Sequence, residues 1–215
     1  MAADSTRLNT TPPAPRTLDG VVGATAARVQ GAYLGEQGER LQARARGTLA
    51  GLRAAAGMSP ESDPLAWQRV LDELLPDFPE RFQGRGDAAS PSERAAFDAL
   101  TLFGLHMQSQ RKRMHIPGRS FAKAAGLLVR KRASESIKPR FDAILTVRNP
   151  NTRRHHLRGL ISLLRSEEIG FDYGHLALDV RRLDGDHRNR VLLAWGRDFA
   201  IGRLRQQDDG TTSND

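Results

Sequence analysis

Apolar residues recur at helical spacing along almost the whole chain, and no stretch alternates between apolar and polar residues as a strand would. The spacing predicts helices over residues 20–34, 39–56, 64–75, 91–108, 119–132, 135–147, 151–167, 173–183 and 187–205. The first two of these helices lack clear capping residues. The pattern therefore predicts an all-α protein.

Two of the expected helices carry strong start signals. Asp63 followed by Pro64 marks one start, and Pro76 ends that run. Ser90 and Glu93 form the pattern of a capping box, with a proline at the first helical position between them. The residues after this box are apolar nearly all round, so we expect this helix to be the central and most buried one.

A basic run, RKRMHIPGRS, interrupts the helical pattern at residues 111–120, where Pro117 and Gly118 break it. This break predicts two packed helical bundles joined by a basic connector. The predicted division is a disordered lead over residues 1–17, an N-terminal bundle over 18–113, a C-terminal bundle over 114–205 and a disordered tail over 206–215.

Charge is unevenly distributed along the chain. The formal net charge is +8, but the segment from Arg111 to Arg165 has 15 lysines and arginines against two acidic residues, a local balance of +13. Segregation of this kind is typical of a nucleic-acid-binding surface. The alternative is a solvated helix face without a polyanionic partner.

The helix expected at 151–167 combines a buried stripe with a basic margin. On a helical wheel, Arg154, Arg158 and Arg165 fall within roughly 40° of one another beside the apolar residues. The sequence thus predicts a rail of three projecting guanidinium groups. The adjacent His155 and His156 point about 100° apart, so they cannot chelate one ion together.

Signatures of catalysis and of metal binding are missing. The chain has no cysteine, no phosphate-binding GxxxxGK[ST] loop and no GxSxG elbow, and its histidines lack metal-ligand spacing. We therefore expect no catalytic residue, no metal and no cofactor. No segment approaches the roughly 20 apolar residues of a membrane span, and no signal-peptide pattern occurs, so we expect a soluble, cytoplasmic protein without a membrane partner.

Several ordered motifs resemble one known family. They are ALTLFGLH (99–106), HIPGRSFAKAAGLL (115–128), FDAILTVRN (141–149), HHLRGLISLLRSEEIGFDYGHLALDV (155–180) and VLLAWGRDF (191–199). Together they resemble the CasB family, the small subunit of the type I-E CRISPR surveillance complex, Cascade. The resemblance spans about residues 60–200 and is weak before them.

The resemblance implies a non-enzymatic, all-helical subunit, present as a pair of copies. Its implied partners are the other Cascade subunits, the guide RNA, and the target and displaced DNA strands, which basic residues hold apart so that the R-loop is stabilised. The positions that match basic residues of the family are Arg140, Arg148 and Arg158, with Arg119 and Arg53 as weaker matches. The candidate nucleic-acid-binding set is completed by Arg154, Arg165 and Lys123. One departure from the family is Pro139, which is expected to start or kink the helix and so to rotate Arg140.

The sequence alone is also compatible with two other functions. A free-standing helical protein that binds nucleic acid without sequence preference would show the same charge segregation, although no recognition-helix signature supports it. If the protein were a purely structural spacer, changes of the arginines would leave DNA binding intact. Isolation with other subunits and a guide RNA distinguishes the first alternative from a Cascade subunit.

Overall fold

A computed structural model of the chain describes residues 17–74 and 77–204, and this part is all-α. The elements are α1 (Leu18–Tyr33), α2 (Glu39–Ala54), α3 (Pro64–Leu74), the short 3-10 helix η1 (Glu80–Phe82), α4 (Pro91–His106), α5 (Phe121–Arg132), α6 (Ile137–Thr146), α7 (Pro150–Ser166), α8 (Tyr173–Leu183) and α9 (Arg188–Leu204). Pro76 and, apart from Thr17, the lead and tail expected to be disordered lie outside the described residues.

The all-α expectation is confirmed, and each expected helix begins within two residues of an observed one. One local expectation is wrong. The helix α1 does have a cap, because the Thr17 side chain accepts a hydrogen bond from the Gly20 amide at 3.3 Å. The helix α2 begins after Gly38 without a side-chain cap.

The helix α4 is the central, most buried element, as expected. Fourteen of its residues are buried, from Ser92 to His106. The capping box is also confirmed, since the Ser90 hydroxyl accepts from the Glu93 amide at 3.0 Å and the Glu93 carboxylate accepts from the Ser90 amide at 2.6 Å. The capping box determines where α4 starts. The apolar surface of α4 on nearly all sides explains why other helices surround it.

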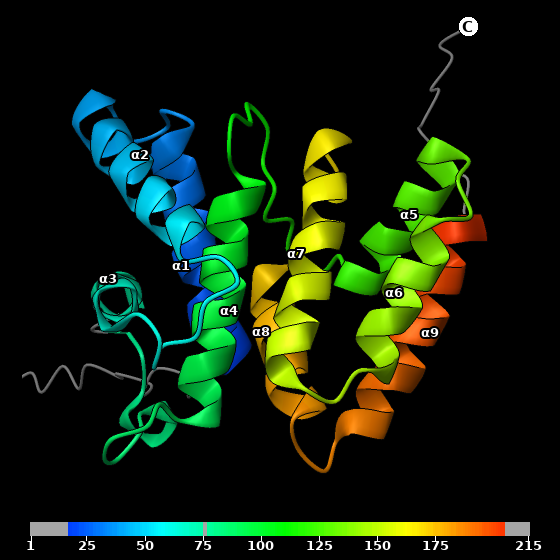
Figure 1. Cartoon of the computed structure of the whole chain (residues 1–215). Coiled ribbons are helices and arrows are strands. Elements are labelled where there is room, and N and C mark those ends of the chain that lie inside the picture. Colours follow the sequence, from blue (N-terminus) through cyan, green and yellow to red (C-terminus); the bar gives the residue numbers. More distant parts are fainter. Residues whose placement is uncertain (1–16, 75–76, 205–215) are drawn as a thin grey trace, which may run out of the picture.

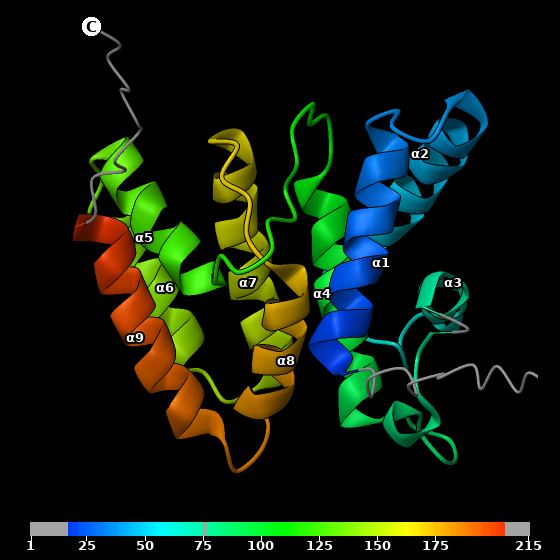
Figure 2. The ribbon, with the colours of Figure 1, turned by 180° about the vertical axis from the view of Figure 1, so that it is seen from behind.

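The helices form one continuous core rather than two separate ones. Figure 1 shows α1 to α4 on one side, α5, α6 and α9 on the other, and α7 and α8 between them. Seen from behind, α8 lies beside α1 (Figure 2), and it packs on α4 as well. One hydrophobic cluster contains side chains from α1 to α9. The division into bundles at residues 113 and 114 stays a prediction.

The basic connector is anchored to the core at its middle. Arg111, Lys112 and Arg113 are exposed, but Met114 and His115 are buried. The buried Gln30 side chain in α1 accepts from both of their amides, at 2.7 and 2.8 Å, and donates to the His115 carbonyl at 3.1 Å. A single amide side chain thus satisfies three buried backbone groups and positions the connector.

One histidine, His106, is fully buried in the core. The His106 Nδ1 atom lies 2.8 Å from the Tyr173 hydroxyl, and its Nε2 atom is buried without a hydrogen-bond partner among the described residues. Burial, followed by repulsion from Arg165, lowers the pKa of His106 to about 3. The imidazole is therefore neutral at pH 7.

Protonation of His106 should destabilise the fold. Because its folded-state pKa lies below the unfolded value of about 6.5, its contribution is complete above that pH and is lost as the pH falls towards 3. We expect it to remove up to about 1.4 kcal/mol of unfolding free energy per pH unit below 6.5. Urea unfolding at pH 7 and pH 5, compared with His106→Gln, measures this. An equal loss in both proteins would show that His106 is not responsible.

Candidate nucleic-acid interface

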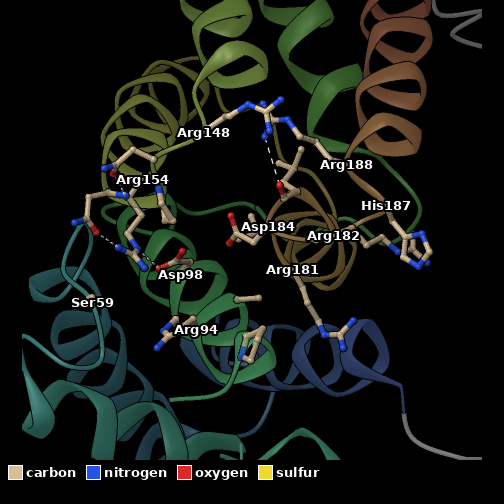
Figure 3. A pocket seen from close by; sticks show the side chains of 18 of the residues that line it. Ser59, Arg94, Asp98, Arg148, Arg154, Arg181, Arg182, Asp184, His187 and Arg188 are labelled. Carbon is tan, nitrogen blue, oxygen red and sulfur yellow. Dashed lines mark hydrogen bonds and ion pairs between the residues drawn. The ribbon is translucent and has the colours of Figure 1, made fainter. Parts of the chain in front are cut away.

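A hollow of about 910 Å³ opens where the N-terminal and C-terminal helices meet (Figure 3). Its walls come from residues 59–61, the first half of α4, the N-terminus of α7, the end of α8 and the loop between α8 and α9. Segments about 90 residues apart in the chain therefore meet around one space. We call this space the cationic hollow.

The cationic hollow is lined by more basic than acidic side chains. The arginines are Arg94, Arg148, Arg154, Arg181, Arg182 and Arg188, and the carboxylates are Glu61, Asp98, Asp184 and Asp186. Three of these carboxylates are already in ion pairs: Glu61 with Arg94 at 2.8 Å, Asp98 with Arg154 at 2.6 Å, and Asp184 with the buried Arg153.

Four lining arginines have no ion pair with a described carboxylate. Arg181 donates to the Ser92 hydroxyl at 2.8 Å, and Arg188 donates to backbone carbonyls. Arg148 and Arg182 are exposed, with no hydrogen bond or ion pair to another described residue. These guanidinium groups keep donors available for an anion.

Two of these arginines repel each other. The Arg188 guanidinium is held by the carbonyls of Leu145 at 2.6 Å and Val147 at 3.2 Å, which places it beside Arg148 (Figure 3). Burial first, and then the positive charges of Arg148 and Arg153, lower the pKa of Arg188 below its usual value. An anion between Arg148 and Arg188 would relieve this repulsion.

The N-terminus of α7 opens on the same space. Asn149 caps the helix by accepting from the amides of Asn151 at 2.9 Å and Thr152 at 3.2 Å, and Pro150 occupies the first helical position. Arg148 directly precedes this capping residue and lies in the loop before α7. The helix dipole adds partial positive charge at this end.

The expectation that three arginines of α7 project as a rail is wrong for two of them, Arg154 and Arg165. Arg154 is only 5 % exposed, because its guanidinium turns inwards to Asp98 and Asn151. Desolvation outweighs the attraction of Arg154 and raises the pKa of Asp98 to about 6. Arg165 is half-buried and donates to the Gln108 side chain. Only Arg158 of the three is exposed without such a partner.

Arg158 continues the cationic surface along α7. It is not part of the hollow's lining, but it lies beside the turn that leads to Ser59, since a Cβ at Gly57 would be 3.6 Å from the Arg158 side chain. From residue 148 to the end of α7, the exposed arginines are Arg148 in the hollow and Arg158 beyond it.

The other expected residues lie away from the cationic hollow. Arg140 is exposed on α6, where Pro139 occupies the first turn and its missing N–H removes no helical hydrogen bond. Arg53 is exposed near the end of α2, Lys123 is half-buried on α5, and Arg119 donates to the Gly170 carbonyl at 3.2 Å.

Sequence reasoning missed four lining arginines: Arg94, Arg181, Arg182 and Arg188. Three of them lie in the run RRLDGDHRNR at 181–190, which has four arginines and follows the segment of highest net charge. From this run of arginines, a basic surface at 181–190 could have been predicted. Arg94 could not have been predicted in this way, because it is a single arginine in the first turn of a helix.

Neither metal ligation nor membrane insertion has support in the described part of the chain. No group of three or more histidine or acidic side chains there is arranged to hold a metal ion. The His155 and His156 rings lie edge to face with centroids 5.9 Å apart. Among the described helices, none is long and apolar enough to span a membrane.

Comparisons with known proteins point to one family. The family model of the CRISPR-associated protein Cse2 matches residues 48–199. A crystal structure of CasB from Thermobifida fusca is similar, with 28% identity and a TM-score of 0.67, covering 85% of this chain and 97% of that one. No curated protein sequence matches.

Two further solved structures share the fold. One is a CRISPR-associated protein of the Cse2 family from Thermus thermophilus, with 22% identity, a TM-score of 0.60, and coverage of 86% of this chain and 99% of that one. The other is a chain of a CRISPR RNA-guided surveillance complex, with 22% identity, a TM-score of 0.64, and coverage of 87% and 95%.

Proposed function

The chain belongs to the CRISPR-associated Cse2 family, whose members include CasB, and on that premise we propose that it is a non-catalytic, nucleic-acid-binding subunit of an RNA-guided CRISPR complex. Its proposed partners are the other Cascade subunits, the guide RNA, the target and displaced DNA strands and a second copy of itself. Its proposed location is the cytoplasm. The similar chain from a CRISPR RNA-guided surveillance complex supports the assignment to a complex of this kind.

The observation that carries this proposal is the cationic hollow, in which four arginines have no carboxylate partner among the described residues. Guanidinium groups bind phosphates through charge-assisted hydrogen bonds and release condensed counterions. Phosphates are identical along a strand, so such contacts carry no sequence information. The hollow is suited to a nucleic-acid backbone of any sequence.

The same contacts would stabilise an R-loop. Exchange of a DNA duplex for a guide RNA heteroduplex is nearly neutral in base-pairing free energy, so a few additional phosphate contacts decide the balance. Arg148, Arg182 and Arg188 would hold a separated strand along the hollow and so oppose reannealing. Arg158 would continue the contact along α7. The guide RNA would supply all sequence recognition.

A salt titration tests the nucleic-acid part of this proposal. We expect the isolated protein to bind single- and double-stranded DNA weakly and without sequence preference, with log K falling by roughly 0.7 to 0.9 per phosphate contact for each unit of log salt concentration. Fluorescence anisotropy measures the slope. A flat response would contradict phosphate binding by this protein.

Co-purification separates the proposed role from its alternative. Expression of the chain with the other Cascade subunits and a guide RNA should yield one complex that retains it. A chain that binds DNA alone and never enters the complex would instead be a free-standing nucleic-acid binder, which is the second function compatible with the charge distribution.

A further inference from the structure

A second hollow, of about 370 Å³, lies between α3 and the loop that leads into α4. Figure 1 shows α3 and this loop on the left. Pro60, Pro64 and Trp67 line one side, and the small residues of the segment 84–89 line the other. The Trp67 ring packs against Phe97 with centroids 6.1 Å apart, so it is held in place. One wall of this hollow is therefore aromatic and apolar. Because carboxylates also line it, we call it the acidic pocket.

The charge of this pocket is opposite to that of the whole chain. Three carboxylates line it, from Glu61, Asp87 and Glu93, and no lysine or arginine does, although the chain has a net charge of +8. Glu93 is occupied by the capping box and the Gly84 amide, and Glu61 by Arg94. Asp87 is exposed and has no partner among the described residues. Carboxylates repel phosphates, so this pocket is unsuited to nucleic acid.

Two exposed apolar side chains are close in sequence to residues that line the acidic pocket. Leu65 is 65 % exposed beside the lining residue Pro64, and Met58 is 43 % exposed two residues before Pro60. A tryptophan face attracts a cationic side chain, and a nearby carboxylate adds to that attraction. Apolar and aromatic groups that surround one charge pair are typical of protein interfaces.

We propose that the acidic pocket docks a segment of a partner protein that carries an arginine or lysine beside an apolar residue. The cation would lie against Trp67 and pair with Asp87, and the apolar neighbour would cover Leu65. The inference rests on the proposed function, because the partner is another protein subunit of the RNA-guided complex.

The position of the acidic pocket is compatible with simultaneous nucleic-acid binding. Glu61 lines both this pocket and the cationic hollow, so the two spaces are neighbours, and they share no other lining residue. A protein segment in the pocket would therefore leave the arginines of the hollow available. The opposite charges of the two spaces would also direct each partner to its own site.

A charge reversal at Asp87 tests this inference. Asp87→Lys disturbs neither the capping box nor the Glu61–Arg94 ion pair, so it should fold normally. In assembly from purified subunits and guide RNA, we expect the variant to be retained about tenfold less than wild type, since the loss of one charge pair of this kind is worth about one order of magnitude in affinity. Asp72→Lys is the matched control, because Asp72 is exposed on the nearby α3 and does not line the pocket. It should be retained within about twofold of wild type.

Photo-crosslinking identifies the occupant. With Leu65→p-benzoylphenylalanine in the assembled complex, mass spectrometry should find a crosslink to a segment of another subunit that contains arginine or lysine. The same substitution at Leu193, 63 % exposed on α9, is the control and should not crosslink to that segment. A crosslink from Leu65 to nucleic acid or to a second copy of this chain would overturn the inference.

Failure of the inference is distinguishable from failure of the proposed function. If wild type enters the complex and Asp87→Lys enters it equally well, only the docking inference is overturned. If wild type does not enter the complex at all, the proposed function is overturned, and the inference with it.

Discussion

Gly202→Ala is expected to lower the free energy of unfolding by about 3 kcal/mol, because the added methyl group has no space. A Cβ at Gly202 would lie 2.3 Å from the Lys123 carbonyl oxygen and 3.1 Å from the Gly126 Cα. Both contacts are with backbone, which cannot rotate away as a side chain can. The helices α5 and α9 would have to separate, which would loosen the contact between Phe121 and Trp195, whose centroids are 5.3 Å apart.

A second glycine in the same helix is the control for this prediction. A Cβ at Gly196 would meet no atom within 4 Å. Gly196→Ala should therefore be neutral or stabilise the protein by up to about 1 kcal/mol, as alanine favours a helix over glycine. Urea unfolding of the two variants measures the difference. Equal stabilities would contradict the close approach of α5 and α9.

The positions of the helices could be predicted from the sequence because they depend on local features. The 3.6-residue recurrence of apolar side chains and the Ser90–Glu93 box are complete within one segment. The contacts between helices could not be predicted in this way. Nothing local shows that Gly202 faces α5 whereas Gly196 faces open space, or that Gln30 in α1 holds the connector through His115.

The candidate site could be predicted only in part, for the same reason. The sequence shows a basic segment and indicates Arg148 and Arg158, which are both exposed. A helical wheel places Arg154 relative to its own helix alone. Its burial depends on Asp98, which α4 supplies from 56 residues earlier in the chain. Folding also brings Arg94 into the lining of the hollow, and no feature of the sequence predicts this position.

A double charge reversal in the cationic hollow should have the largest effect on nucleic-acid binding. Arg148 and Arg182 line the hollow, are exposed and make no hydrogen bond or ion pair with another described residue, so Arg148→Glu with Arg182→Glu should fold and assemble as wild type does. DNA affinity at low salt should fall about a hundredfold, and the salt slope should decrease by roughly 0.7 to 0.9 for each phosphate that is no longer bound. The loss should be similar for all target sequences, because phosphates carry no sequence information.

The matched control for the double reversal changes the net charge equally at a different place. Arg130 on α5 and Arg197 on α9 are exposed, do not line the hollow and have no partner within the described ranges. Arg130→Glu with Arg197→Glu should therefore reduce affinity only by the long-range charge effect, which salt screens. In the assembled complex, footprinting of the displaced strand should show reduced protection with the Arg148 and Arg182 pair alone. Equal losses from both pairs would mean that net charge, and not the arrangement of arginines in the hollow, holds the strand.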